Sequence, residues 1–96
     1  MATDILTEPQ SLLEIRTYFV DFTNALPAAV TVSTVTATHI PPSGTPSTPT
    51  VVTTYKPIIQ ITLGPLSVLG EHKLSVLAVL SDGEKIEARL RIPVNF

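Results

Sequence analysis

The sequence predicts an all-β fold, an antiparallel β-sandwich with an extended N-terminal arm, and three observations support this prediction. Val, Ile and Thr, which favour strands, account for 32 of the 96 residues. Nine prolines are spread along the chain, and each disfavours a helix interior at its position. The windows between them alternate apolar and polar residues in parts and show no sustained helical period. Short strands joined by turns fit a sandwich or a small barrel. The long last hairpin, ending in the edge-type proline Pro93, favours the sandwich.

Two parts of the chain differ in character. Residues 1–13 form the predicted N-terminal arm, and residues 14–96 form the sandwich domain. The arm cannot bury its own apolar residues, so we expect them to pack back on the sandwich or to contact a neighbouring subunit. These candidate interface residues are Ile5, Leu6, Leu12 and Leu13.

Residues 14–22 are the first predicted strand of the domain, with Tyr18, Val20 and Phe22 on one face. Residues 29–40 form a long second strand. Its apolar residues change from even to odd positions, which predicts a β-bulge near Ser33.

A loop rich in proline, serine and threonine follows at residues 41–50, with the sequence PPSGTPSTPT. It holds no residues suited to a core, so we interpret it as either a solvent-exposed tip or a contact loop of polyproline II character. Its prolines are therefore candidate interface residues: Pro41, Pro42, Pro46 and Pro49. Two short strands are expected next, at residues 51–55 and 58–63.

The last segment predicts a β-hairpin of residues 73–81 and 84–94 around Asp82-Gly83. A two-residue loop would set apolar residues against charged ones. A three-residue loop, with Gly83 in a left-handed conformation, places apolar residues opposite each other. We therefore predict the three-residue loop, which pairs Leu80 with Glu84, Ala78 with Ile86, Val76 with Ala88 and Leu74 with Leu90.

The other face of this hairpin carries a row of charges formed by Lys85, Glu87, Arg89 and Arg91. It is interpreted either as a solvated face that protects the sheet or as a polar stripe that contacts a partner. Leu77 and Val79 share this face, as they would in a partly covered surface. On the second interpretation Leu77, Val79, Arg89 and Arg91 are candidate interface residues.

Catalytic chemistry finds no support in the sequence. Without cysteine there is no thiolate nucleophile and no thiolate zinc site. His39 is expected in a strand-end or interface role, and His72 is expected to hydrogen-bond a corner of the sandwich. Asp82 and Glu84 are too few for a calcium site, and Asp82 is expected to accept backbone hydrogen bonds in the turn. We therefore expect no enzyme activity, no catalytic or metal-binding residues and no cofactor.

Charge and hydropathy limit the class of partner. Six Lys and Arg against eight Asp and Glu give a net charge of −2, and only 15% of residues are charged. Nucleic acid is disfavoured because binding to phosphates needs clustered cations. No apolar stretch reaches membrane-helix length and no signal peptide is evident, so we expect a protein made in the cytoplasm without membrane partners. The sparse charge instead predicts a surface covered by other proteins.

From Tyr18 onward the chain resembles a group of small tailed-phage virion proteins with an immunoglobulin-like (Ig-like) sandwich. The resemblance lies in the segments 20–27 (VDFTNALP), 30–38, 70–76 (GEHKLSV) and 81–85 (SDGEK). It implies an Ig-like antiparallel β-sandwich and a structural role in the virion. Such proteins are described as capsid decoration or cement proteins and as fibre–tail adaptors, and the sequence does not choose between these roles.

The expected function is therefore that of a non-enzymatic structural protein of a phage particle. Its expected partners are capsid, neck or tail proteins and further copies of itself in a homo-oligomer. The alternative is an Ig-like module that binds carbohydrate or a host surface. Glycan sites favour exposed aromatic rings, and Tyr18 and Phe22 are expected to be buried. The remaining aromatic residues are Phe19, Tyr55 and Phe96.

Overall fold

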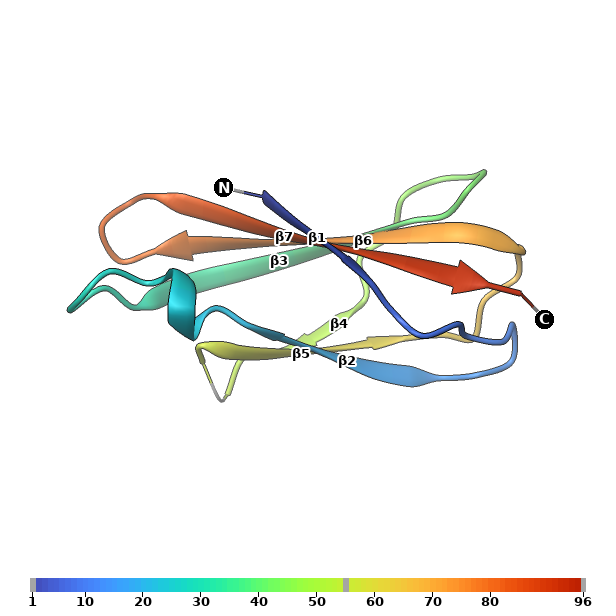
Figure 1. Ribbon diagram of the computed structural model, residues 1–96, viewed down its shortest axis with the longest axis horizontal. Helices are drawn as coiled ribbons and strands as arrows, with labels where there is room; N and C mark the ends of the chain where they lie inside the picture. The colour runs from blue at the N-terminus through green and yellow to red at the C-terminus, as the bar shows by residue number, and fades with distance from the viewer. Residues whose placement is uncertain (1, 55, 96) are drawn as a thin grey trace.

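The chain folds into a β-sandwich of two sheets, shown by a computed structural model that describes residues 2–54 and 56–95, with side chains from Leu6 onward (Figure 1). The strands are β1 (Ala2–Leu6), β2 (Arg16–Asp21), β3 (Val32–Ile40), β4 (Thr50–Val52), β5 (Ile58–Leu63), β6 (Gly70–Leu80) and β7 (Lys85–Val94). One sheet has the order β1-β7-β6-β3 and the other has the order β2-β5-β4. No helix within the described ranges is long and apolar enough to cross a membrane.

The core lies between the two sheets and follows the alternation of the strands. Tyr18, Val20 and Phe22 are buried, as predicted for one face of the first strand. Ile59 and Ile61 of β5 lie beside them on the inner face of the same sheet and are fully buried. The four-stranded sheet contributes the even positions of β6 and β7, which are buried from His72 to Leu80 and from Ala88 to Val94. The all-β sandwich predicted from the sequence is therefore confirmed.

The hairpin of β6 and β7 has the predicted register. Leu74 lies opposite Leu90, Val76 opposite Ala88 and Ala78 opposite Ile86. The amide of Leu80 donates to the carbonyl of Glu84 at 2.8 Å, which closes a three-residue loop. In that loop Gly83 has φ +90°, and Asp82 accepts the amide of Glu84 at 3.0 Å. Both turn predictions are confirmed.

The predicted bulge in the long second strand is also present. The register of β3 against β6 shifts between Val32 and Thr34, so that Val32 and Ala37, at even and odd positions, are both buried. Farther along, the strand expected at residues 51–55 is shorter and earlier, since β4 ends at Val52. Tyr55 lies outside the described residues.

The sequence predicted an extended N-terminal arm at residues 1–13, with the first strand at residues 14–22, and this is where the fold differs most. Ala2–Leu6 form β1, which pairs in parallel with β7 from Glu87 to Arg91. The edge-strand interpretation of the last strand is also wrong, because β7 lies between β1 and β6. Pro93 lies beyond the last β1–β7 pair, so its missing amide costs no β1 hydrogen bond.

The segment after β1 is attached to both sheets through Gln10, which is fully buried. Its amide donates to the carbonyl of Pro93 at 2.9 Å. Its side-chain Nε2 donates to the carbonyl of Glu14 at 2.8 Å and to that of Leu63 at 3.3 Å. Its Oε1 accepts the hydroxyl of Tyr18 at 2.6 Å. One glutamine therefore connects β7, β5 and β2.

Candidate functional site

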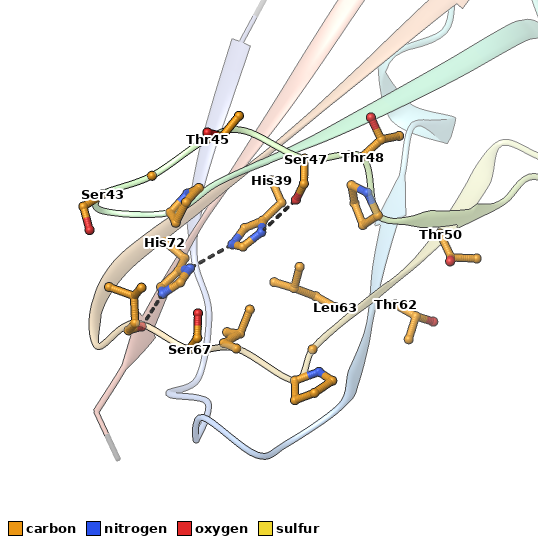
Figure 2. Close-up of a pocket in the computed structure, with 17 residues that line it drawn as sticks. His39, Ser43, Thr45, Ser47, Thr48, Thr50, Thr62, Leu63, Ser67 and His72 are labelled. Atoms are coloured by element: carbon orange, nitrogen blue, oxygen red, sulfur yellow. Dashed lines mark hydrogen bonds between the residues drawn. The ribbon is translucent and has the colours of Figure 1, made fainter.

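Two histidines lie side by side at the end of the sandwich where β3 ends and β6 begins. His39 is 9% exposed and His72 is 1% exposed. Their rings are nearly parallel, at 7°, with centroids 5.0 Å apart. Figure 2 shows both rings between the loop that follows β3 and the segment that precedes β6. Thirty-three positions separate the two residues in the sequence, and the antiparallel pairing of β3 with β6 brings them together.

A chain of hydrogen bonds runs through the two rings. Nε2 of His72 lies 2.6 Å from the carbonyl oxygen of Val68. Nδ1 of His72 lies 2.8 Å from Nε2 of His39, and Nδ1 of His39 lies 3.4 Å from Oγ of Ser47. A carbonyl only accepts, so we assign the proton of neutral His72 to Nε2. The remaining bonds then follow: Nε2–H of His39 donates to His72, and the hydroxyl of Ser47 donates to His39.

The bond to Val68 matches the role predicted for His72, which was to hydrogen-bond a corner at the start of a strand. The strand-end position predicted for His39 is also observed. The contact between the two residues was not predicted. Burial, and then the neighbouring ring of His72, lower the pKa of His39.

A groove of about 610 Å³ lies over the histidine pair, between residues 41–50 and residues 62–68. Its lining contains no Asp, Glu, Lys or Arg, and its polar groups are mostly hydroxyls. These hydroxyls belong to Ser43, Thr45, Ser47, Thr48, Thr50, Thr62 and Ser67. Among the described residues no group of three His, Asp or Glu side chains is placed to hold a metal ion. The groove therefore presents mainly neutral hydroxyl groups.

The outer face of the three-stranded sheet carries several exposed apolar side chains. Phe19 of β2 is 63% exposed, and Ile15 just before that strand is 64% exposed. Val52 and Ile58 add exposed aliphatic surface from β4 and β5. The residues that share this face are Ile15, Thr17, Phe19, Asp21, Thr50, Val52, Ile58, Gln60 and Thr62. We call it the β2 face, and Asp21 is its one acidic residue.

The outer face of the four-stranded sheet has the mixed character that the sequence predicted. Leu77 lies opposite Glu87, and Val79 lies opposite Lys85, with both apolar side chains half-buried. Glu87 accepts Nε of Arg89 at 2.8 Å and the hydroxyl of Ser75 at 2.7 Å. The hydroxyl of Ser75, and to a smaller extent Arg89, lower the pKa of Glu87. The ion pair between Glu87 and Arg89 therefore neutralises part of the charge on this face.

The other predicted interface residues lie in scattered places. Leu6 and Leu13 are exposed, whereas Leu12 packs against the core. The side chain of Ile5 lies outside the described part of the structure, although its backbone pairs with Leu90. In the proline-rich loop, Pro42 and Pro46 are exposed and Pro41 and Pro49 are half-buried.

The proline-rich loop is folded back on the sandwich rather than projecting freely. The amide of His39 donates to the carbonyl of Ser47 at 2.7 Å, and the amide of Ser47 donates back at 2.9 Å. At the loop's start, Pro42 lies against Gly70, where an added Cβ would come within 3.1 Å of the proline ring. Residues 41–50 therefore cover the histidine pair.

Comparisons with known proteins add no identity. No protein-family model, no curated protein and no solved structure matches this chain. The class that the fold defines is a β-sandwich.

Proposed function

We propose that the protein is a non-enzymatic structural protein of a tailed bacteriophage virion, which binds other virion proteins as a capsid decoration or cement protein or as a head, tail or fibre adaptor. The observation that carries the binding role is the β2 face. Large contiguous apolar surfaces are uncommon on monomeric proteins and often mark interaction sites.

The order of the strands supports the Ig-like part of this proposal. In immunoglobulin sandwiches one sheet holds the second, fourth and fifth strands, and the other holds the third, sixth and seventh. Here β2, β5 and β4 form one sheet, and β3, β6 and β7 are in the other. The first strand, β1, pairs with β7 instead of β2. On that side of the sandwich the edge strands are therefore β1 in one sheet and β2 in the other, and both come from the N-terminal half of the chain.

The β2 face favours a protein partner of low charge. Phe19 lies opposite Gln60 in the register, and Val52 flanks Gln60 from the other side. Burying a fully exposed apolar side chain contributes about 1.5–3 kcal/mol, and covering these partly exposed side chains contributes a share of that range each. Asp21 at the end of the face accepts the amide and the hydroxyl of Thr23 at one oxygen, Oδ1.

The outer face of the four-stranded sheet is a weaker candidate. Its charges are partly paired with each other, as Arg89 is with Glu87. A partner on this side would have to desolvate both charged groups, which costs free energy, whereas covering the exposed ring of Phe19 is favourable. We therefore assign the main contact to the β2 face and propose that Leu77, Val79, Arg89 and Arg91 border a second contact.

The test is co-sedimentation of the purified chain with tailed-phage particles whose genome encodes it. We expect a fixed number of copies per particle, and we expect Phe19→Ser to abolish binding. Leu69→Ser is the matched control, because Leu69 is 54% exposed but lies off the β2 face. A wild-type protein that stays monomeric and does not sediment with the particles refutes the proposal. Portal, capsid or tail genes beside the gene would support it.

A second candidate function is binding of carbohydrate on a host surface. Phe19 favours it, because an exposed aromatic ring beside Thr and Gln side chains can stack on a sugar ring. A glycan array separates the two functions: glycan binding that disappears in Phe19→Ala would select this candidate, whereas an array without signal would reject it.

A further inference from the structure

The histidine pair closes one end of the sandwich, and its hydrogen bonds depend on where protons sit. His39 is the last inward-facing residue of β3, and its backbone anchors residues 41–50 through both bonds to Ser47. His72 is the first inward-facing residue of β6, and its Nε2 holds the preceding segment through the carbonyl of Val68. Contact between the two rings therefore joins two separate loops at one point.

The neutral pair satisfies all of its hydrogen-bonding atoms. Ser47 donates to His39, His39 donates to His72, and His72 donates to Val68, so each ring uses one donor and one acceptor. All three hydrogen bonds therefore point the same way, from Ser47 toward Val68. Among the described residues no buried side-chain nitrogen or oxygen lacks a partner.

A second proton disturbs this arrangement. On Nδ1 of His72, with His39 still protonated on Nε2, it would place two N–H groups against each other across the 2.8 Å contact, where both would be donors. On Nδ1 of His39 it would keep a partner, because the hydroxyl of Ser47 can turn and accept. The ring would then carry a full charge at a buried position, which burial disfavours.

No carboxylate in the described structure compensates such a charge. The strand neighbours of His72 are Glu71 and Lys73, which point to the opposite face of the sheet, where Arg91 pairs with Lys73. Ile92 is the residue of β7 opposite His72.

The other elements around the pair offer no anion either. Residues 41–50, 58–63 and 64–69 contain no ionisable side chain, and His39 is the one ionisable residue of β3. Glu14, whose backbone oxygen lies near Gly64, has its carboxylate paired with Arg16 at 2.6 Å.

We propose that the His39–His72 contact is a pH-sensitive latch, which in the neutral form holds residues 41–50 and 64–69 over the end of the core and which opens when acid protonates the pair. Opening separates the two rings, lets each imidazolium reach water and releases both loops that line the groove. The rest of the sandwich stays closed, since the backbone pairing of β6 with β7 and the Gln10 contacts do not use the two imidazole rings. This inference does not depend on the proposed function.

The direction of the pH dependence follows from proton binding. The closed form disfavours a proton on His39, as its lowered pKa indicates, whereas the open form binds one with the ordinary histidine pKa of about 6.5. The free-energy preference for the closed form is therefore complete above about pH 6.5 and decreases as the pH falls below that value. If the closed pair stays neutral and one histidine is freely titrated in the open form, the opening equilibrium at pH 5 rises about thirtyfold.

The test is amide hydrogen exchange followed by NMR at about pH 7.5 and about pH 5, with each rate divided by its intrinsic rate. In the wild-type chain we expect the protection factors of the His39 and Ser47 amides to fall by up to about thirtyfold at the lower pH. The amide of Leu80, in the hairpin, serves as the internal control and should keep its protection.

His39→Gln is the decisive variant. A glutamine amide can turn to offer either its NH₂ or its oxygen to His72, so it can pair with both the neutral and the protonated ring. We expect this variant to fold and to lose less loop protection than the wild type when the pH is lowered, because only one histidine of the pair remains to bind a proton. Ser47→Ala is the matched control, because it leaves the contact between the rings intact and should keep the acid response.

Three results would overturn the proposal. The first is equal loop protection at both pH values in the wild-type chain. The second is an acid response in His39→Gln as large as in the wild type. The third is a loss of protection at Leu80 that parallels the loops, which would mean global unfolding rather than opening of a latch.

Discussion

The hydroxyl of Tyr18 donates a 2.6 Å hydrogen bond to Oε1 of Gln10, and through this bond the segment after the first strand is joined to the core of the opposite sheet. Both residues are buried, at 7% and 0% exposure. Gln10 also reaches β5 and β7 through Leu63 and Pro93. The contact explains how a strand as short as β1 is kept in place beside β7.

Tyr18→Phe tests this contact. It removes the hydroxyl and leaves Oε1 of Gln10 buried without a donor, which costs about 1–3 kcal/mol. Urea unfolding should show a lower midpoint with an unchanged slope. Gln60→Met is the control, because Gln60 is half-exposed on the outer side of β5, and its effect should stay within about 0.5 kcal/mol. Equal midpoints for Tyr18→Phe and the wild type would show that the bond contributes nothing.

The same tyrosine predicts a loss of stability in alkali. Burial raises the pKa of Tyr18. In the unfolded chain tyrosine loses its proton near pH 10, so the unfolded state binds fewer protons than the folded state above that pH. The contribution of Tyr18 is therefore complete below about pH 10 and is lost as the pH rises further. An absorbance titration of the folded protein should show this tyrosine ionising late, and a Tyr18 that ionises at the ordinary pH would contradict the burial argument.

Gly64→Ala is expected to be among the most damaging single substitutions. Gly64 has φ +122°, and a Cβ there would lie 2.2 Å from the backbone oxygen of Glu14, which cannot move without disturbing the Gln10 contacts. Gly83→Ala is the matched control, since Gly83 also has a positive φ but an added Cβ meets nothing within 4 Å. Gly83→Ala should cost about 1–2 kcal/mol from backbone strain alone. The difference between the melting temperatures of the two variants measures the cost of the clash at Gly64. Similar melting temperatures would mean that the backbone at Glu14 moves away from the added Cβ.

The sequence predicts the hairpin well because its information is local. The phase of apolar residues on each side of Gly83 fixes one register, and a slip by one residue would expose several of them. The bulge near Ser33 is predicted for the same reason, since the change of phase in β3 has to be absorbed within that strand.

The histidine contact was missed because it depends on a long-range pairing. The strand phases alone place His39 and His72 on inward-facing positions. Nothing local indicates that β3 is the neighbour of β6, and that neighbour relation is what sets the two rings side by side. The burial of Gln10 was missed in a similar way, because its partners lie on three strands that are distant in the sequence.

The parallel strand β1 shows the same limit. Its residues carry little alternation that would distinguish a strand from an extended arm, and its partner β7 lies at the opposite end of the sequence. The interface predictions rested on apolar character in the arm, on proline content in residues 41–50 and on the mixed charge of the last hairpin. They therefore included Leu12, which the fold partly buries, and omitted Phe19, whose odd position in β2 points it outward.

Ser75→Ala tests the electrostatics of the outer face of the four-stranded sheet. The hydroxyl of Ser75 donates to Glu87 and is the main cause of the lowered pKa of that carboxyl, ahead of Arg89. A lowered folded-state pKa stabilises the fold above the ordinary glutamate value of about 4.3, and this contribution is lost as the pH falls through the folded-state pKa. The variant should therefore be less stable than the wild type at neutral pH and equally stable in strong acid.

The accompanying measurement is an NMR titration of the Glu87 side-chain carboxyl carbon, in which Ser75→Ala should move the pKa of Glu87 upward. Arg89→Gln is the control: the arginine side chain is 55% exposed, so solvent screens its pairing and the shift should be smaller. A larger shift in Arg89→Gln than in Ser75→Ala would reverse the assignment and make the arginine the dominant partner of Glu87. The outer face would then be held by its ion pair, and the hydroxyl would serve only to orient the carboxylate.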